Sequence, residues 1–395
     1  MKVLLVNKYW YIRGGAERMV FVTKELLEKA GHEVEIFGMN HPDNIFSNDY
    51  FVDYLDYRKS KGIKKIKSVC KTIYNKQAKE NFARLVKDFR PDVVHFHNIY
   101  HQLSFSLLEV TKAQKIPTVM TLHDYKMISP NYSLYHHNKI DDSLCQLGYY
   151  RCLFNNCMEN WLHSIVAVVE AYFRKLKQYR DDIDLYISPS DFLKAKFVKC
   201  GWDKNKIKVI NNPIESVKNI SKVGDYVAFV GRLSKEKGID ILYKTAKLLP
   251  NIPFKIIGDG PESEDLKNKI NNENIKNIDM VGFKSGKELA DLVSGSRFLI
   301  APSVWYENYP MSILEAKSQA KVILANKIGG LAELLPEEML VKDYQPGVWQ
   351  KEISKWYGKG DEELIKWGKV LEKEVDKNNN QTVYLDKILS VYNEL

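Results

Sequence analysis

Two glutamates, Glu307 and Glu315, lie eight residues apart in a segment that combines a strand, a loop and a helix. Residues 296–303 read as a buried strand, and residues 311–320 have the apolar spacing of a helix. Glu307 is therefore expected in the loop, and Glu315 about two turns into the helix. Carboxylates at these positions could accept hydrogen bonds from hydroxyl groups, as sugars and riboses require. A helix cap and a solvated helical glutamate are the alternative.

The loop at residues 307–310 also presents backbone N–H groups where the helix begins. Such N–H groups attract anions because they have no partner within the helix and the helix dipole is positive there. Asn308 and Tyr309 are therefore candidates for contact with a phosphate or a sugar. Pro310 has no N–H, so one potential donor is absent at this position.

Further upstream, a pair of cations follows the apolar strand at residues 226–231. Gly231 lets the backbone turn tightly, and Arg232 and Lys237 place positive charge beside the next helix. Guanidinium and ammonium groups in this position suit a diphosphate. An ordinary strand–turn–helix with solvated basic residues would have the same pattern.

Two earlier strands also end on residues that could face a ligand. The strand at residues 2–7 leads to Gly14 and Gly15, which permit close backbone approach to a bound molecule. A later strand ends on His123 and Asp124. Open α/β sheets bind ligands at the carboxyl ends of their strands, so these residues are candidates. A plain β–α turn is the alternative at the glycines.

Strands and amphipathic helices alternate along the chain, which predicts an α/β protein with parallel, doubly wound sheets. The first set of apolar strands covers residues 2–7, 34–38, 93–97, 117–123, 185–190 and 208–211. The second set covers residues 226–231, 254–260, 278–283, 297–303 and 321–326.

Length and composition set the broad class. A chain of 395 residues suggests two domains, and its 45% hydrophobic and 28% charged residues are typical of a soluble globular protein. A polar linker over residues 211–224 lies between the expected domains 1–215 and 216–376, and a last helix is expected over residues 382–395. No apolar run is long enough to span a membrane, and no signal peptide precedes the first strand, so a cytoplasmic location is expected.

Together these segments resemble family 4 of the retaining glycosyltransferases, which have the GT-B fold. The resemblance covers nearly the whole chain and implies two Rossmann-like domains that face a cleft. It implies that residues 1–215, joined by the crossing helix 382–395, bind the acceptor, and that residues 216–376 bind the nucleotide sugar. The residues assigned to donor-binding positions are Gly14, Gly15, Gly258, Gly260, Asn308, Tyr309 and Glu315. Asn308 and Tyr309 depart from the family's pattern, since many members have Gly-Phe-Gly or a similar sequence after the first glutamate, and this departure bears on which sugar is bound. The residues matched to catalytic positions are His123, Arg232, Lys237 and Glu307.

The resemblance implies a donor that is a nucleoside-diphosphate sugar. The acceptor would be a saccharide or lipid-linked saccharide in cell-surface polysaccharide synthesis. Arg232 and Lys237 would bind the diphosphate, His123 and Glu307 would lie near the sugar, and Glu315 would bind the ribose. No metal or other cofactor is expected. A nucleotide-sugar 2-epimerase of the same fold, a glycoside phosphorylase and a non-catalytic sugar-nucleotide binder are the alternatives.

Two further signals are weaker. Gly258 and Gly260 follow a strand, but the third glycine of a dinucleotide fingerprint is missing, so NAD binding is not favoured. They match instead a Gly-Asp-Gly-Pro turn of the glycosyltransferase family. Asp182 and Asp184 have the spacing of a metal-binding motif, but they precede a strand and read as a solvated turn.

Three of the five cysteines, Cys145, Cys152 and Cys157, are close in the sequence. Five cysteines are too few for a disulfide scaffold in a cytosolic chain, so a structural or simply reduced trio is expected. A zinc site completed by His136 or His137 is the alternative.

A basic segment supplies much of the net charge of +9. Residues 58–79 contain nine Lys and Arg and no acidic residue, with apolar residues at helical spacing. A helix of this kind can bind an anionic membrane surface, and Lys64, Lys65, Lys67 and Lys71 are its central cations. A core-facing stripe with a solvated lysine face is the alternative, and no nucleic-acid-binding motif accompanies the charge. The helix expected at residues 161–179 is a second candidate for membrane contact.

Overall fold

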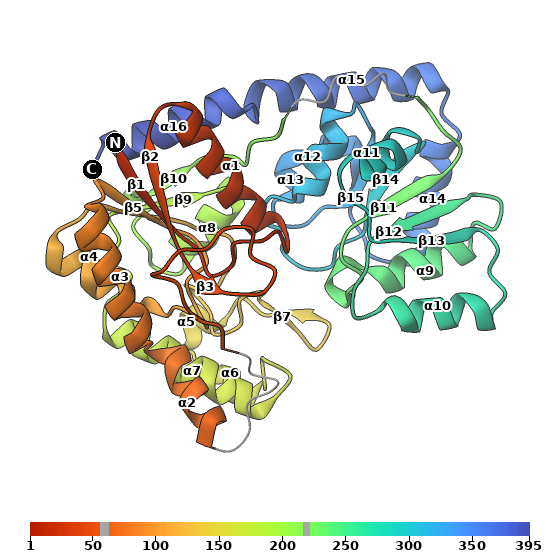
Figure 1. Ribbon diagram of the computed structural model, residues 1–395. Helices are drawn as coiled ribbons and strands as arrows, with labels where there is room; N and C mark the ends of the chain where they lie inside the picture. Colours follow the sequence, from red (N-terminus) through yellow and green to blue (C-terminus); the bar gives the residue numbers. More distant parts are fainter. Residues whose placement is uncertain (56–62, 216–221) are drawn as a thin grey trace. The chain divides into compact units, whose positions relative to one another are not determined.

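The computed structural model describes residues 1–55, 63–215 and 222–395 (Figure 1). The chain divides into two compact units. Unit 1 comprises Met1–His137, Asp141–Ile210 and Tyr384–Leu395, and unit 2 comprises Asn138–Ile140 and Asn211–Val383. Each unit contains one six-stranded sheet with helices around it, so the predicted two-domain, Rossmann-like α/β fold is confirmed.

The sheet of unit 1 is parallel, with strand order β10-β9-β6-β5-β1-β2. Its strands are β1 (Lys2–Val6), β2 (Glu33–Phe37), β5 (Val93–Phe96), β6 (Thr118–Thr121), β9 (Leu185–Ser188) and β10 (Ile207–Val209). β5, β6 and β9 are buried along their whole length, as expected for a parallel sheet covered on both faces. The strand order switches direction between β1 and β5, and ligands bind outside the carboxyl ends of strands at such a switch.

Helices that alternate with these strands cover the sheet. They are α1 (Gly15–Lys29), α2 (Ile63–Ile73), α3 (Lys76–Phe89), η1 (Phe105–Leu107), α4 (Leu108–Gln114), α5 (Leu144–Leu147), α6 (Arg151–Phe154), α7 (Trp161–Leu176), α8 (Asp191–Lys199) and η2 (Lys204–Lys206). Asn75, Asn160 and Ser190 cap α3, α7 and α8, each accepting a hydrogen bond from a backbone N–H of the first turn. Two short pairs of strands lie outside the six-stranded sheets, β3 (Met39–Asn40) with β4 (Val52–Asp53), and β7 (Tyr135–His136) with β8 (Lys139–Ile140).

The helix at the other end of the sequence, α16 (Gln381–Asn393), completes the core of unit 1. The hydroxyl oxygens of Thr23 on α1 and Tyr384 on α16 are 2.7 Å apart. The hydroxyl of Tyr392 lies 2.7 Å from Nδ1 of His95 on β5. All four side chains are buried. Unit 1 is therefore closed by residues from both ends of the sequence.

The sheet of unit 2 is also parallel, with strand order β13-β12-β11-β14-β15-β16. Its strands are β11 (Val227–Val230), β12 (Phe254–Ile257), β13 (Ile278–Gly282), β14 (Phe298–Ala301), β15 (Ile323–Asn326) and β16 (Leu340–Val341). Its helices are η3 (Lys235–Lys237), α9 (Ile239–Lys247), α10 (Ser263–Asn272), α11 (Gly286–Ser294), α12 (Met311–Ser318), α13 (Leu331–Leu334), η4 (Glu337–Met339), α14 (Pro346–Tyr357) and α15 (Asp361–Asn378). The order switches between β11 and β14, so residues that follow these two strands meet at one edge of the sheet.

Several strands end before the apolar runs that predicted them. The run at residues 254–260 is a strand only to Ile257, because the chain turns at Gly258, where φ is +149°. A Cβ at Gly258 would lie 1.9 Å from the backbone oxygen of Gly231, so only glycine fits this turn. The last residues of the apolar run thus belong to the loops at the carboxyl edge of the sheet.

Candidate functional site

Unit 2 brings Lys237 and Glu307 together where its strand order switches. Lys237 ends η3, which follows β11, and Glu307 lies in the loop between β14 and α12. Nζ of Lys237 is 2.6 Å from Oε1 of Glu307, and the Ser303 hydroxyl donates to the same oxygen at 2.7 Å. Two residues that were predicted from separate motifs therefore form one ion pair.

Glu307 is buried, with only 5% of the residue exposed. Burial raises its pKa, but the Lys237 charge and the hydrogen bonds from Lys237 and Ser303 outweigh this effect, and the net pKa lies below its ordinary value. The group is therefore a carboxylate at neutral pH, held in one orientation. Such a group accepts hydrogen bonds, as contact with sugar hydroxyls requires.

Two glycines that sequence reasoning missed, Gly329 and Gly330, hold the loop that carries Glu307. The N–H of Gly330 donates to the backbone oxygen of Glu307 at 2.6 Å. A Cβ at Gly330 would lie 1.8 Å from the backbone oxygen of Asn308, and Gly329 has φ of +58°. Larger residues are therefore excluded from both positions. The signal in the sequence is the Gly-Gly pair that follows the strand expected at residues 321–326.

The other predicted cation of unit 2, Arg232, is not part of this ion pair. Its side chain is exposed and forms no ion pair with any residue that the structure describes. Gly260 packs against the loop after β11, since a Cβ there would lie 2.3 Å from the backbone oxygen of Leu233. Gly258 and Gly260 therefore have a packing reason to be glycine, and their contact with a nucleotide stays a prediction.

Tyr309 and Glu315, two predicted donor-binding residues, differ in how far they are buried. α12 begins at Met311, so Glu315 lies little more than one turn into the helix instead of the predicted two, and its side chain is partly exposed. Tyr309 is buried, and its hydroxyl accepts a hydrogen bond from Nδ2 of Asn379 at 3.0 Å. Burial raises the pKa of Tyr309 to about 12. Tyr309 thus anchors the loop, and donor binding by its side chain stays a prediction.

In unit 1, three strands that meet at the switch in strand order are followed by polar side chains. Lys8 follows β1, and its backbone N–H donates to the oxygen of Asn98 at 2.9 Å. His97 follows β5, and His123 comes soon after β6. Nδ1 of His97 and Nε2 of His123 are 2.9 Å apart. Lys8 and His97 are therefore neighbours of the predicted site that sequence reasoning missed, because both lie at the ends of apolar runs.

Side chains at this edge of the unit 1 sheet have pKa values that burial shifts from their ordinary values. Burial, assisted by the charge of Lys8, lowers the pKa of His123 to about 4. Burial raises the pKa of Asp124 to about 6 against the opposing hydrogen bond from the Lys126 N–H. Burial lowers the pKa of Lys8 to about 8. His123 is therefore a neutral imidazole at neutral pH.

A buried charge cluster fixes the loop that carries His123 and Asp124. Oε2 of Glu170 on α7 lies 2.7 Å from Nζ of Lys126, and its Oε1 accepts from Nη1 of Arg174 at 2.8 Å. The three side chains are at most 5% exposed. Burial raises the pKa of Glu170, but the charges of Arg174 and Lys126 lower it to about 2. The cluster ties α7 to the segment after β6.

The predicted glycine loop leaves open space. Gly14 precedes α1 and Gly15 is its first residue. Gly14 has φ of −173°, which any residue can adopt, and a Cβ there would meet only Oε2 of Glu17 at 3.9 Å. The backbone therefore gives no reason for glycine at position 14, and the room beside it is what close approach of a ligand requires.

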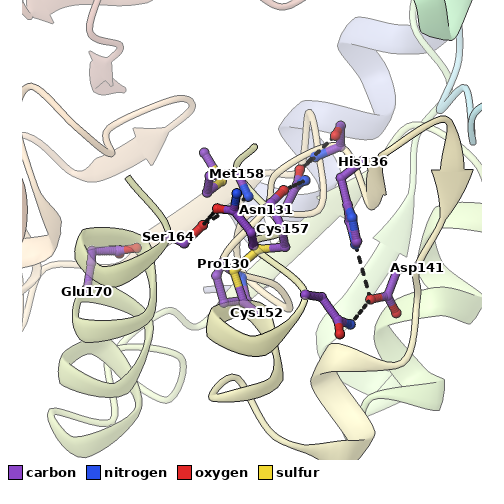
Figure 2. Close-up of a disulfide and its surroundings, with 12 residues drawn as sticks. Pro130, Asn131, His136, Asp141, Cys152, Cys157, Met158, Ser164 and Glu170 are labelled. Atoms are coloured by element: carbon purple, nitrogen blue, oxygen red, sulfur yellow. Dashed lines mark hydrogen bonds and ion pairs between the residues drawn. A yellow bond between two sulfur atoms is a disulfide. The ribbon is translucent and has the colours of Figure 1, made fainter. Parts of the chain in front are cut away.

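The cysteines differ from the expectation. One disulfide joins Cys152 to Cys157 (Figure 2), and a second joins Cys145 to Cys200, which leaves Cys70 as an exposed free thiol. The expected reduced trio and its zinc alternative are therefore wrong. His136 lies beside Asp141 instead, with Nε2 3.2 Å from its Oδ2. The Cys145–Cys200 pair could not be recognised from the cluster of three cysteines, because Cys200, at the end of α8, is far away in the sequence.

The Cys145–Cys200 disulfide also lines a cavity of about 340 Å³ in unit 1, together with Tyr149, Arg174 and Trp202. In the described ranges, no group of three or more His, Cys, Asp and Glu side chains is arranged to hold a metal ion.

The basic segment is described only in part. Residues 58–62 and the side chains of Lys64, Lys65 and Lys67 lie outside the described residues, although the backbone from residue 63 forms α2. Of the later cations, Lys79 pairs with Glu109 at 2.6 Å. Across residues 1–55, 63–215 and 222–395, no helix combines the length and apolar character needed to cross a bilayer.

The solved structures that share this fold include the Anabaena protein HepE in complex with UDP-glucose. It aligns over 100% of both chains with a TM-score of 0.66 and 16% sequence identity. This likeness shows that the chain has the GT-B fold, with two Rossmann-like units.

The amino-acid sequence gives the family. Residues 13–217 match the family model described as Glycosyltransferase Family 4, and residues 212–370 match the model described as Glycosyl transferases group 1. The chain therefore belongs to glycosyltransferase family 4.

Among its relatives is an uncharacterized 42.6 kDa protein in the cps region of Klebsiella pneumoniae. It is 26% identical over 367 residues, which cover 87% of this chain and 91% of the relative. The O-antigen biosynthesis glycosyltransferase WbnH of Escherichia coli is 32% identical over 187 residues, 47% of this chain and 51% of that protein.

Proposed function

We propose that this chain is a retaining glycosyltransferase that moves a sugar from a nucleoside-diphosphate sugar to a saccharide or lipid-linked saccharide. The observation that supports this most is the Lys237–Glu307 pair at the switch in strand order of a family 4 chain. The UDP-glucose complex of HepE supports a nucleoside-diphosphate sugar as donor. The relatives from a cps region and from O-antigen biosynthesis support a role in cell-surface polysaccharide synthesis.

In this proposal, three groups stabilise the leaving diphosphate. Lys237 and Arg232 supply positive charge, and the first turn of α12 supplies N–H groups and the positive end of a helix dipole. Pro310 contributes no N–H, so the helix donors begin at Met311. One preorganised donor of this kind contributes roughly 2.7–4 kcal/mol to stabilisation of the transition state.

The sugar and the ribose are assigned to other residues. Glu307 accepts hydrogen bonds from sugar hydroxyls, His123 contacts the transferred sugar, and Glu315 binds the ribose. The acceptor oxygen forms the new bond to the anomeric carbon on the face from which the diphosphate leaves. The departing phosphate oxygen takes the proton of the acceptor hydroxyl. This scheme retains the anomeric configuration and needs no protein nucleophile.

The test is a donor screen followed by product analysis. Thermal unfolding with a panel of nucleoside diphosphates and their sugars should show selective stabilisation by one base, because a ligand that binds only the folded state raises its stability. With that donor and an oligosaccharide acceptor, proton NMR should show a product with the anomeric configuration of the donor. Glu307→Gln, purified in parallel, should bind the nucleoside diphosphate and form little product.

Other products would identify the alternatives. A donor that is returned as its 2-epimer in the absence of acceptor would indicate an epimerase. A donor that binds but stays intact with every acceptor would indicate a sugar-nucleotide binder. A product of inverted configuration would contradict retention and leave glycosyl transfer intact.

A further inference from the structure

Unit 1 contains a cavity of about 340 Å³. Its wall is formed by the loop after β6, the segment around α5, the end of α7 and the residues that follow α8. None of the described residues that line it has a part in the proposed sugar transfer. Pockets for small ligands typically measure roughly 300–1,000 Å³. The cavity is therefore large enough for a small molecule and too small for a whole lipid.

The wall of the cavity carries more positive than negative charge. Arg174, Lys175 and Arg180 are its cations, and Asp181 is the one acidic residue among the described residues that line it. Oδ1 of Asp181 lies 3.4 Å from Nε of Arg180, so these two charges already offset each other. Three cations less one carboxylate leave two positive charges in excess. An anionic ligand would balance them.

Arg174 is the buried cation of this wall. The residue is only 4% exposed, and its Nη1 donates to Oε1 of Glu170 at 2.8 Å. Glu170 also pairs with Lys126, so these three side chains together retain one positive charge. Nη2 of Arg174 is buried and has no hydrogen-bond partner in residues 1–55, 63–215 and 222–395. A buried N–H without an acceptor costs free energy, and an anion at this part of the wall would supply the acceptor.

The remaining wall is braced and partly aromatic. The Cys145–Cys200 disulfide ties α5 to the end of α8, and both cysteines line the cavity. The rings of Tyr149 and Tyr172 contact each other with centroids 5.4 Å apart, and Trp202, which is 8% exposed, lines the cavity as well. Such rings offer apolar surface to the body of a ligand. A braced site also loses little conformational freedom when a ligand binds.

We propose that this cavity binds a phosphate monoester of a small ring compound, with the phosphate against the three cations and the ring against Tyr149 and Trp202. A phosphate monoester carries a charge of about −1.5 to −2 near neutral pH, which matches the two excess positive charges of the wall. Its oxygens can accept hydrogen bonds from more than one of the cations. The site is separate from the Lys237–Glu307 pair of unit 2, and the inference does not depend on the proposed glycosyl transfer.

The first experiment compares three probes of the same ring size by calorimetric titration. The chain is used with both disulfides intact, as checked by thiol titration. Phenyl phosphate should bind, and benzoate should bind roughly tenfold or more weakly, because it has less charge and fewer acceptors. Phenol, which has the ring and no charge, should not bind measurably.

The second experiment removes the charge and the ring separately. Lys175→Gln/Arg180→Gln should bind phenyl phosphate roughly tenfold or more weakly, since charge-assisted hydrogen bonds are lost. Both side chains are exposed, so thermal unfolding of the variant without ligand should match the wild type. Lys355→Gln, at an exposed lysine of α14, is the matched control and should bind like the wild type. Tyr149→Ala should weaken phenyl phosphate and leave the affinity for inorganic phosphate unchanged.

The third experiment locates the ligand. The indole N–H resonance of Trp202, assigned by its loss in Trp202→Phe, should shift when phenyl phosphate is added. Arg174→Lys keeps the buried charge but removes Nη2, so it should weaken phenyl phosphate. Lys237→Ala should bind phenyl phosphate like the wild type, because Lys237 belongs to unit 2 and does not line the cavity.

Several results would overturn the proposal. One is a wild-type chain that does not bind phenyl phosphate, or that binds phenol equally well. Another is binding that leaves the Trp202 resonance unchanged. A third is binding that Lys237→Ala removes and Lys175→Gln/Arg180→Gln retains, which would assign the phosphate to unit 2.

Discussion

Lys237 and Glu307 share one charged hydrogen bond of 2.6 Å, although 70 residues separate them in the sequence. Lys237 keeps Glu307 ionised, because the carboxylate is buried and its pKa would rise without the cation. The pair is therefore a structural element of its loop as well as a candidate for catalysis.

Replacement of Lys237 by alanine should slow sugar transfer on the order of 10²–10³-fold, because a cation at the leaving diphosphate is lost. It should also lower the free energy of unfolding, since Glu307 is left buried without its partner. Steady-state rates and urea unfolding measure the two effects. Lys244→Ala, which removes an exposed lysine of α9, should change neither. Near-wild-type rates in both Lys237→Ala and Arg232→Ala would remove the diphosphate assignment.

Glu315→Ala tests the ribose role. Its carboxylate is partly exposed on α12 and contributes little to the core. The variant should bind the free nucleoside diphosphate more weakly by roughly tenfold, as expected when a charged hydrogen bond is lost. Calorimetric titration measures the affinity. Glu338→Ala, an exposed carboxylate of η4, is the control. An unchanged affinity in a folded Glu315→Ala protein would show that this carboxylate does not bind the ribose.

His97 should act as a positioning residue for His123. His97 is 2% exposed, and its Nε2 has no hydrogen-bond partner in the described part of the chain. Its side chain thus makes one hydrogen bond, from Nδ1 to His123. Burial lowers the pKa of both rings, so each is neutral and one must donate to the other. The bond therefore couples the tautomers of the two rings, so a change at His97 alters the proton position on His123.

A pair of isosteric variants separates this role from packing. The amide of asparagine reaches the place of Nδ1, whereas the amide of glutamine reaches that of Nε2. His97→Asn should retain most of kcat, and His97→Gln should lose roughly 10²-fold, with the affinity for nucleoside diphosphate unchanged in both. Nitrogen-15 NMR of labelled histidines should show one tautomer of His123 in the wild type. Equal rates in the two variants would assign His97 to packing alone.

Sequence reasoning found most strands because parallel strands covered on both faces are continuous apolar runs, as at β1 and β11. β16 was missed because Leu340 and Val341 are too short a run to show a pattern. The motifs around Lys237 and Glu307 could be recognised, but their contact could not, since it depends on strand order. The role of His97 was missed because this residue was read as the last residue of a strand.

The buried cluster around Glu170 makes stability depend on pH. The pKa of Glu170 is about 2 in the folded chain and about 4.3 in an unfolded one, so folding is favoured by its ionised form. This contribution is present above about pH 4.3 and is lost as the pH falls toward 2. Glu170→Gln should flatten this part of the stability curve in urea unfolding at several pH values.

Removal of the carboxylate should be costly at neutral pH. Glu170→Ala leaves Lys126 and Arg174 buried without their counter-ion and should destabilise the chain by about 3–5 kcal/mol. Glu25→Ala breaks an exposed ion pair with Lys29 and should cost at most about 1 kcal/mol. Similar urea midpoints for the two variants would contradict the structural importance of the cluster.

The disulfides predict one reactive thiol in the native chain. Five cysteines less the four in disulfides leave Cys70. Reduction should destabilise unit 1, because closing a loop of 55 residues contributes about 4 kcal/mol and closing one of 5 residues about 2 kcal/mol in the chain-entropy model. Thiol titration and thermal unfolding with and without a reductant measure these effects. More than one thiol in protein trapped directly from cells would contradict this prediction and show that the disulfides are not formed there.

The two tyrosines of α16 that bond to Thr23 and His95 also determine the order in which the chain can fold on a ribosome. All of unit 2 precedes Tyr384 in the sequence, so unit 2 has its complete sequence before unit 1 does. Domains usually fold in the order of their synthesis, N-terminal first. Here unit 1 cannot complete its core until α16 has been synthesised, after all of unit 2. Until then the apolar residues that α16 covers are exposed, and a chaperone that binds apolar segments would act in this interval.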